Sequence, residues 1–472
     1  PVACRPGSGR FLPAPPPECS TEGRLSPAGR PPEGRGAETR LAAYRILTDV
    51  RAGAYADRAS QQRLAGLDDR DRALALELAF GVIRLRARLD AELARLVDRP
   101  LSALDAALLD WLRLGLYQIR QTRIPEHAAV HATVEGARTE VGRGAAGLVN
   151  AVLRRAAREG APEEAFPARE RQPVEWLATW GSHPEWLVRR WLGRWPLADV
   201  ERLVENDNRP PSVTLRLLGS DESGRRMTDV ESGIELERLE GQSRMVRLVS
   251  GEPARALESW RAVAQDPAAS AVVDFVGADI EGPVLDACAA PGGKAAALAD
   301  LAPGARPFVA ADVSQDRIRR AVSTLNRTGS NVQPVVMDAR RPAIRSARTV
   351  LLDSPCSGTG VLRRRPDARW RLSERRLESL LSLQVELLDA CADVVEPGGL
   401  LVYSTCSLEV EENEGQVEAF LSRRPEFTRE PPESLTGLAA DCVTDRGDLE
   451  ILPFRSGTDG AFASRLRKGG QE

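Results

Sequence analysis

Two different patterns of apolar and polar residues occur along the chain, one in its N-terminal part and one in its C-terminal part. Between about Glu38 and Arg158, apolar residues recur three and four positions apart, as in LAAYRILTDV, ALDAALLDWLRLGLYQI and AAGLVNAVLRRAA. This spacing places apolar side chains along one face of a helix. We therefore predict an all-α domain of five or more helices over residues 37–162.

Beyond residue 265, short apolar runs alternate with polar loops and helix-like segments. The runs PVLDA, PFVAADV, VQPVVMD, TVLLD and GLLVYSTC are predicted strands. Strands that alternate with helices are typical of a doubly wound, mainly parallel sheet. We predict a multidomain chain in which an α/β Rossmann-like domain over residues 265–472 follows the all-α domain.

The two remaining segments have less regular patterns. Residues 1–36 are rich in Pro, Gly and Arg without periodicity, so we expect a disordered tail. Residues 163–264 hold a Pro-rich break, a Trp-rich helical stretch and the runs VTLRLL and RMVRLVSG. We expect these two runs to be short strands of a linking subdomain, and the tryptophans to be packing groups.

Composition narrows the possible functions. The 472 residues contain no apolar run long enough to cross a membrane and no signal-peptide pattern, so we expect a cytoplasmic protein without membrane contact. The seven cysteines form no CxxC pair, which argues against a disulfide framework and a structural zinc site. His127 and His131 have the spacing of two metal ligands, but no third ligand joins them in a recognisable motif, and we expect no metal.

Acidic residues end most of the predicted strands, namely Asp286, Asp312, Asp338 and Asp353. Ligands of such sheets bind at the carboxyl ends of the strands. Asp312 is placed to accept hydrogen bonds from a ribose, and Asp338 to contact an adenine amino group. After Asp286 comes a loop whose glycines allow close approach of backbone, at a helix N-terminus that favours an anion. This loop consists of Cys288, Ala289, Ala290, Pro291, Gly292, Gly293 and Lys294.

The same loop lacks the glycine spacing of dinucleotide-binding and nucleoside-triphosphate motifs. A nucleoside pocket without a phosphate cradle suits S-adenosylmethionine (SAM). The segments DACAAPGGK, DSPCSGTGVLRRRPDARW, YSTCSLEVEENE and QDPAASAVV closely resemble the signatures of the RsmB/NOP family of RNA cytosine-5 methyltransferases. The resemblance covers roughly residues 170 to 470, and the helical region is similar to a NusB-type RNA-binding domain.

The resemblance implies SAM-dependent methylation of a cytidine in small-subunit (16S) ribosomal RNA. The same reaction on tRNA or another RNA is an alternative. A second alternative is a non-catalytic RNA-binding factor of ribosome assembly that has kept the fold. The presence of Cys356, Cys406 and Asp353 together argues against that second alternative.

Two cysteines lie beside predicted strand ends, Cys356 in a Pro-Cys pair and Cys406 in a Thr-Cys pair. Carbon 5 of cytosine is a poor nucleophile, so a thiolate must first add to carbon 6. Asp353, holding a proton or sharing one with N3 of the base, would stabilise the adduct. Spacing leaves open which thiol attacks: the Pro-Cys pair of DNA cytosine-5 enzymes favours Cys356, whereas the resemblance to RNA enzymes assigns attack to Cys406 and release to Cys356.

A basic stretch, Leu362 to Arg376, directly follows the Cys356 loop. Its seven arginines against two acids give a local charge of 7 − 2 = +5, although the whole chain carries −3. Such a stretch can hold RNA phosphates beside a reacting base that has been turned out of its helix. We expect the RNA to contact Arg363, Arg364, Arg365, Arg369 and Arg371. We also expect the protein to be a monomer.

Overall fold

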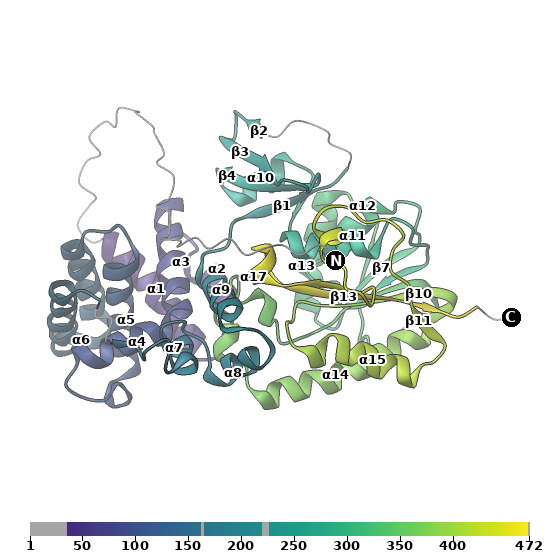
Figure 1. The fold of residues 1–472 in the computed structure, drawn as a ribbon. Helices are drawn as coiled ribbons and strands as arrows, with labels where there is room; N and C mark the ends of the chain where they lie inside the picture. The colour runs from purple at the N-terminus through teal and green to yellow at the C-terminus, as the bar shows by residue number, and fades with distance from the viewer. Residues whose placement is uncertain (1–34, 162–164, 220–225, 471–472) are drawn as a thin grey trace.

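The computed structural model describes residues 35–161, 165–219 and 226–470. Figure 1 shows a helical body on the left, an α/β body on the right and a small sheet above the α/β body. Of the predicted tail, residues 1–34 lie outside the described residues, and residues 35 and 36 already belong to the first helix. No helix in the described ranges has the length and apolar character needed to span a membrane.

The helical body forms where the 3.6-residue pattern predicts it. Its helices are α1 (Arg35–Arg51), α2 (Ala56–Arg63), α3 (Asp69–Arg84), α4 (Arg86–Leu96), α5 (Ala106–Gln121) and α6 (Glu126–Glu159). Asp68 caps α3 and Asp105 caps α5, each accepting a hydrogen bond from a backbone N–H of the first turn. Trp111 of α5 is fully buried and stacks on Tyr44 of α1, with ring centroids 4.7 Å apart. The helices therefore share one apolar core.

The segment between the two bodies is more ordered than its sequence pattern indicates. It contains α7 (Pro173–Thr179), α8 (Glu185–Arg194), α9 (Leu197–Asn208) and α10 (Pro253–Ser259), and the strands β1 (Thr214–Leu217), β2 (Arg226–Asp229), β3 (Ile234–Arg238), β4 (Met245–Ser250) and β5 (Ala262–Ala264). The expected strands β1 and β4 are confirmed, and they pair antiparallel in a five-stranded sheet of order β2-β3-β4-β1-β5. Trp191 and Trp195 are buried in an apolar cluster with Leu362 and Phe454, which confirms a packing role for this part of the Trp-rich stretch.

The α/β body is a mixed sheet of order β11-β13-β10-β9-β6-β7-β8, with β12 paired to β13. Its elements are α11 (Pro267–Val276), β6 (Val284–Asp286), α12 (Gly293–Leu301), β7 (Phe308–Asp312), α13 (Gln315–Thr328), β8 (Gln333–Val336), β9 (Ala347–Asp353), α14 (Glu374–Asp393), β10 (Val395–Thr405), α15 (Glu414–Arg423), β11 (Phe427–Arg429), α16 (Gly437–Asp441), β12 (Leu449–Ile451), α17 (Pro453–Ser456) and β13 (Ala461–Lys468). All five predicted strands form, and β6 to β10 run parallel. The unpredicted β13 runs antiparallel to β10, so the sheet is mixed.

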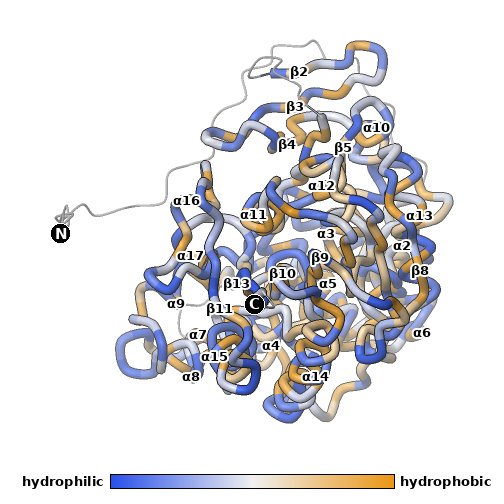
Figure 2. Tube along the Cα trace, turned by 90° about the vertical axis from the view of Figure 1, so that its right-hand side faces the viewer, coloured by the Kyte–Doolittle hydropathy of each residue, from blue (hydrophilic) through white to orange (hydrophobic). Residues whose placement is uncertain are grey.

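Helices cover both faces of this sheet. In Figure 1, α11, α12 and α13 lie on one face, and α14 and α15 lie on the other. The apolar cores on the two faces are separate, and Figure 2 shows polar segments on outer turns such as the one near α8. From β6 the chain builds β7 and β8 on one side and then crosses to β9 on the other. The crevice at this switch point is where ligands of such sheets bind.

Candidate active site

The predicted cofactor loop joins β6 to α12. Gly292 has a φ of +93°, and a Cβ there would lie 3.1 Å from the Cα of Ala321, so the turn requires glycine. The next residue, Gly293, begins α12, and a Cβ on it would meet no atom within 4 Å. The loop therefore presents open backbone at a helix N-terminus.

The acids that end β6 and β7 lie beside this loop. Asp286 is fully buried, and both of its carboxyl oxygens lack a hydrogen bond in the described part of the chain. Burial, reinforced by the charge of Asp353, raises the pKa of Asp286 to about 8. Asp312 accepts a hydrogen bond from the Ser314 N–H at 2.9 Å, and its other oxygen lies 3.3 Å from Nη2 of Arg317.

Arg317 is a site residue that the sequence analysis missed. Its Nη2 also donates to the carbonyl of Ala290 at 3.0 Å, so it ties the cofactor loop to Asp312. The only sequence signal was its place in the first turn of the helix after Asp312. By contrast, Asp338 turns toward its own loop, where hydrogen bonds from Arg340 lower its pKa. Its contact with adenine stays a prediction.

The two thiols lie side by side, with Sγ of Cys356 3.4 Å from Sγ of Cys406. The parallel pairing of β9 and β10 continues into the two loops, since the Ser354 N–H donates to the Ser404 carbonyl at 2.8 Å. Further on, the Gly360 N–H donates to the Cys406 carbonyl at 3.0 Å. A Cβ on Gly360 would lie 2.8 Å from that carbonyl oxygen, so glycine allows the loops to close together.

Lys294 and Asp353 link the cofactor loop to the thiols. Nζ of Lys294 donates to Oδ2 of Asp353 at 2.8 Å, and the Ser404 hydroxyl donates to Oδ1 at 2.9 Å. Burial lowers the pKa of Lys294, but the attraction of Asp353 outweighs it, and the net shift is upward. The ammonium is therefore a permanent positive charge between the two loops.

The surroundings of the thiols differ in charge. The hydrogen bond between the two thiols lowers the pKa of Cys406 against the cost of burial. The charge of Asp353 raises this pKa, and the charges of Lys294 and Arg365 lower it. The pKa of Cys356 is raised well above its ordinary value, by the same hydrogen bond and by burial. The opposite directions of the two pKa shifts favour ionisation of Cys406 before Cys356.

The other described cysteines have inert surroundings. Burial raises the pKa of Cys288 well above its ordinary value, and that of Cys391 to about 12. Cys391 lies fully buried in the core beneath α14, as its apolar helix face predicts. A thiol of raised pKa is a poor nucleophile. Burial also raises the pKa of Cys442, so among the described cysteines only Cys406 has a lowered pKa.

Comparison with known proteins identifies the family of this chain. A model described as 16S rRNA methyltransferase RsmB/F matches residues 277–467, a NusB family model matches residues 37–158, and a ferredoxin-like domain model of the RsmF/B type matches residues 183–218. Ribosomal RNA small subunit methyltransferase B of Cronobacter sakazakii is 35% identical over 85% of this chain and 92% of its own. The protein is a member of the RsmB/F methyltransferase family.

Two further known proteins are similar to this chain over nearly its whole length. The protein of the same name from Pseudomonas putida is 36% identical over 91% of this chain and 98% of its own. The crystal structure of PH0851 has a TM-score of 0.73 and 25% sequence identity, and covers 93% of this chain and 100% of its own. The order of helical body, small sheet and α/β body is thus shared with a solved structure.

In the basic stretch after Cys356, the structure differs from the prediction that Arg369 contacts RNA. Arg369 is completely buried and donates to the carbonyls of Arg84, Ser182 and Asp207. It holds the helical body to the rest of the molecule, so its assignment as an RNA contact was wrong. The sequence hid this role because burial depends on segments that are distant in the chain.

The neighbouring arginines also have partners within the protein. Arg364 forms ion pairs with Asp266 and Asp459, and Arg371 donates to backbone carbonyls that precede α2. Arg363 donates to the carbonyls of Gly457 and Pro210. These three stay candidates only through their exposed edges. Arg365 is exposed, lies on the Cys406 side, and is the one best placed for an RNA phosphate.

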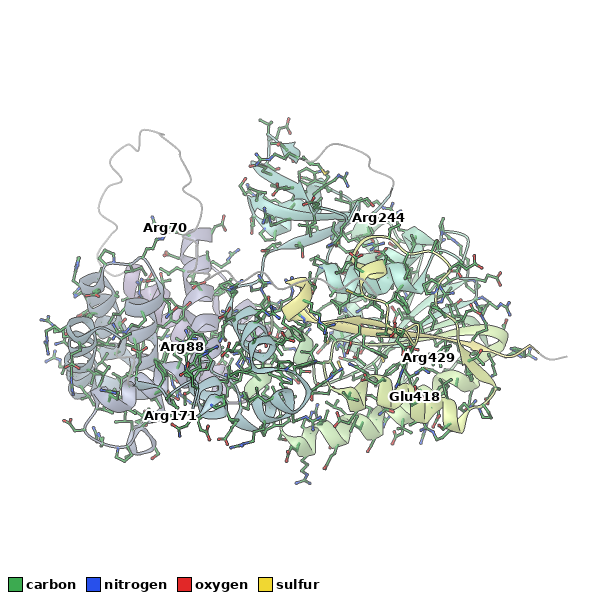
Figure 3. All side chains as sticks on the ribbon, viewed as in Figure 1. Arg70, Arg88, Arg171, Arg244, Glu418 and Arg429 are labelled. Atoms are coloured by element: carbon green, nitrogen blue, oxygen red, sulfur yellow. The ribbon has the colours of Figure 1, made fainter. Side chains whose placement is uncertain are left out.

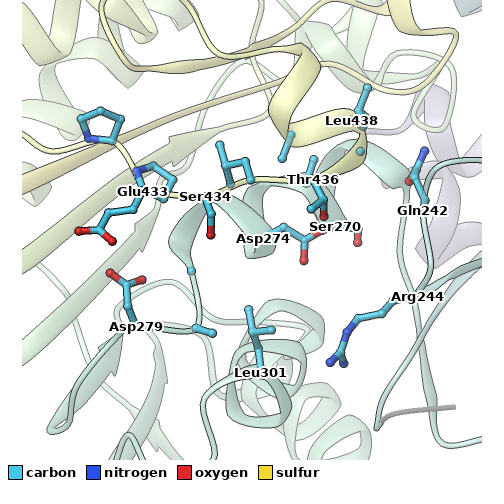
Figure 4. A pocket seen from close by; sticks show the side chains of 18 of the residues that line it. Gln242, Arg244, Ser270, Asp274, Asp279, Leu301, Glu433, Ser434, Thr436 and Leu438 are labelled. Atoms are coloured by element: carbon cyan, nitrogen blue, oxygen red, sulfur yellow. The ribbon is translucent and has the colours of Figure 1, made fainter. Parts of the chain in front are cut away.

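One cavity lies away from this site. It has a volume of about 730 Å³ and lies where the small sheet, α11 and the segment before α16 meet. Figure 4 shows Arg244, Asp274, Asp279 and Glu433 around it. Neither thiol lines this cavity. His127 and His131 are exposed on α6, and the described residues contain no cluster of three or more metal-binding side chains.

Proposed function

We propose that this chain transfers a methyl group from SAM to carbon 5 of a cytidine in 16S ribosomal RNA. The observation that carries the proposal is the pair of contacting thiols, Cys356 and Cys406, joined through Asp353 and Lys294 to a nucleoside-type loop. A cytosine needs one thiol to attack and one group to assist release. A non-catalytic factor has no physical need for this arrangement.

The loop and the acids fit SAM. The open backbone at Gly293 suits the amino-acid end of the cofactor. Oδ2 of Asp312, which accepts no hydrogen bond and lies 3.3 Å from Nη2 of Arg317, suits a ribose hydroxyl. The full set that would hold the cofactor is Cys288 to Lys294, Asp312, Asp338 and Asp353. When bound, SAM supplies a methyl group activated by a sulfonium.

Cys406 is the proposed nucleophile. As a thiolate it adds to carbon 6, forming the Sγ–C6 bond and moving electrons toward N3 and carbon 5. Asp353 stands beside Cys406 and would hold or share the proton at N3, and Lys294 fixes the position of that carboxyl group. The unequal ionisation of the two thiols favours Cys406 over Cys356, which spacing alone left open.

Cys356 is the proposed release group. After methylation, the proton on carbon 5 passes to a base, either water or the Asp353 carboxylate. Its bonding electrons form the C5–C6 double bond, and the C6–Sγ bond breaks toward Cys406. The protonated thiol of Cys356, whose Sγ lies 3.4 Å from that of Cys406, then donates a hydrogen bond to the departing thiolate.

The RNA partner is proposed from the names of the relatives and from the fold. The relatives are described as small subunit ribosomal RNA methyltransferases, and residues 37–158 match a NusB family model, a domain that would position the RNA. Such a substrate would place the enzyme in the cytoplasm, and we propose that it acts as a monomer.

Nucleoside analysis tests the reaction and its substrate. The full chain is incubated with methyl-labelled SAM and either 16S ribosomal RNA or tRNA, and the RNA is digested to nucleosides. We expect label in 5-methylcytidine from 16S ribosomal RNA and none with Cys406→Ala. Label only from tRNA would support the alternative substrate, and label in a different nucleoside would contradict the proposed chemistry.

A further inference from the structure

The acids that follow Cys406 face in two directions. Glu409 and Glu411 form ion pairs with Arg190 of α8, at 2.9 and 2.7 Å, and Glu414 lies 3.6 Å from Arg194 of the same helix. These three acids hold α8 against the α/β body. Glu412 points the other way and is 0% exposed.

Glu412 is surrounded by neutral donors. Its Oε1 accepts hydrogen bonds from the Ser357 N–H at 2.8 Å and from Nε2 of Gln384 at 2.9 Å, and its Oε2 accepts one from the Ser357 hydroxyl. Among the described residues it has no salt bridge to an arginine or lysine. A buried carboxylate without a cationic partner costs stability, so its presence calls for a specific role.

The donors around Glu412 flank Cys356. Ser357 directly follows this cysteine, and Gln384 also donates to the carbonyl of Pro355, which directly precedes it, at 3.0 Å. The Ser357 hydroxyl lies 3.1 Å from that of Ser407, the residue after Cys406. One carboxylate thus fixes the Cys356 loop on both sides of its thiol and against the Cys406 turn.

We propose that Glu412 is a positioning residue for the release step and acts through Cys356. It holds the Cys356 thiol against Sγ of Cys406 and, by its negative charge, keeps the proton on Cys356. This inference rests on the proposed function, in which Cys356 donates a hydrogen bond to the departing thiolate of Cys406. The role belongs to release and not to cofactor binding.

The charges around Cys356 agree with this role. The titratable groups that face it are Cys406, Glu412 and Tyr403. Its hydrogen bond to Cys406 and its burial raise the pKa of Cys356 most, and the negative charges of Cys406 and Glu412 raise it further. Removing the charge of Glu412 should therefore lower the pKa of Cys356.

A denaturing gel tests the proposal. The protein is incubated with SAM and its 16S ribosomal RNA fragment, and covalent protein–RNA complex is measured for wild type, Glu412→Ala, Cys356→Ala and Cys406→Ala. We expect Glu412→Ala to accumulate complex as Cys356→Ala does, with turnover about 100-fold slower and SAM affinity unchanged. The matched control is Glu411→Gln, an adjacent acid that pairs with Arg190, which should release product normally.

Glu412→Gln removes the negative charge of the side chain but keeps its size and one hydrogen-bond acceptor. This variant keeps an acceptor for the loop, and the pH above which complex accumulates should move down relative to wild type because Cys356 loses its proton more easily. A purely structural residue would leave that pH unchanged. Were Glu412→Ala unable to fold, Ser357→Ala would weaken the same contacts from the other side and should also trap complex.

The outcomes separate two failures. Should Cys356→Ala trap no complex, the proposed roles of the thiols would be wrong whatever Glu412 does. If Cys356→Ala traps complex while Glu412→Ala and Ser357→Ala release product at the wild-type rate, the role of Glu412 alone is overturned. An unshifted pH dependence in Glu412→Gln would overturn the part of the proposal that concerns its charge.

Discussion

Cys356 and Cys406 have different chemical surroundings although their sulfur atoms lie 3.4 Å apart. Lys294 and Arg365 act on Cys406, and Glu412 acts on Cys356. The motifs indicated both thiols, because each follows a predicted strand, but could not rank them. Ranking depends on which charges the folded chain brings near each sulfur, and those charges come from distant segments.

We predict that the Asp312 carboxylate contributes to SAM binding. Asp312→Ala removes a charged acceptor from the proposed ribose site, which should cost about 1.5 to 3 kcal/mol, or roughly 10 to 150-fold in SAM affinity. Isothermal calorimetry of the two proteins measures this loss. Equal dissociation constants would remove Asp312 from the cofactor site.

Asp286 gives a prediction about pH. Its pKa is about 8 in the folded protein, against 3.8 for the ordinary side chain, so between these values the folded state holds a proton that the unfolded state has lost. Stability in the absence of cofactor should therefore fall with rising pH, by at most about 1.4 kcal/mol per pH unit from this group. Asp286→Asn should flatten that slope in denaturant unfolding at several pH values. A slope that persists unchanged would show that other groups cause it.

At the scale of elements, two loops must lie against each other to bring the thiols together. The sequence predicted β9 and β10, and their parallel pairing follows from the βαβ pattern. The SGTG turn indicated a tight loop, but not its partner. Close contact with the Cys406 carbonyl is visible only in the folded chain.

Gly360→Ala tests this packing. The added Cβ would lie 2.8 Å from the Cys406 carbonyl and 2.9 Å from the Cα of Gly460, which are both backbone atoms. Overpacking of this kind costs about 1 to 3 kcal/mol, and should push the Cys356 loop away from β10. We expect methylation to fall while SAM binding persists. Gly304→Ala, where a Cβ meets nothing within 4 Å, is the control; equal rates for both variants would contradict the role of this contact.

At the scale of the whole molecule, the basic stretch after Cys356 joins the helical body to the α/β body. The Trp370 indole donates to the Ile83 carbonyl at 2.8 Å, and Arg84 donates to the Arg363 carbonyl at 3.1 Å. Arg88 of α4, labelled in Figure 3, lies over the ring of Trp180 directly after α7, 4.4 Å from its centroid. Composition predicted the positive charge of the stretch but not its burial, although the apolar residues between its arginines were a signal.

Arg369→Ala should destabilise this junction. It leaves three backbone carbonyls and the Asn208 side chain without their donor, and breaking a buried charged contact typically costs about 3 to 5 kcal/mol. Denaturant unfolding of the full chain measures the loss. The exposed Arg375 of the same stretch provides the control, because Arg375→Ala should stay within about 0.5 kcal/mol of wild type. Equal stabilities would show that Arg369 does not hold the bodies together.

The sequence pattern predicts some strands of the large sheet and misses others. The parallel strands β6 to β10 are apolar runs that end in acids or in Thr-Cys, and the sequence predicts all five. β13, with the sequence AFASRLRK, was missed because its charged residues hide a strand whose first six residues are buried. Arg465 is buried there through its pair with Asp279, so its burial depends on a contact that periodicity cannot show.

The most direct test of the account is to identify the cysteine that bonds to RNA. A 16S ribosomal RNA fragment that carries 5-fluorocytidine has no proton on carbon 5 to remove, so the methylated adduct cannot be released. Trypsin separates the thiols, because Cys356 lies between Arg348 and Arg363 and Cys406 lies between Arg376 and Arg423. We predict that mass spectrometry finds the methylated nucleotide on Sγ of Cys406. A nucleotide on Cys356, or no adduct with an otherwise active enzyme, would contradict the account.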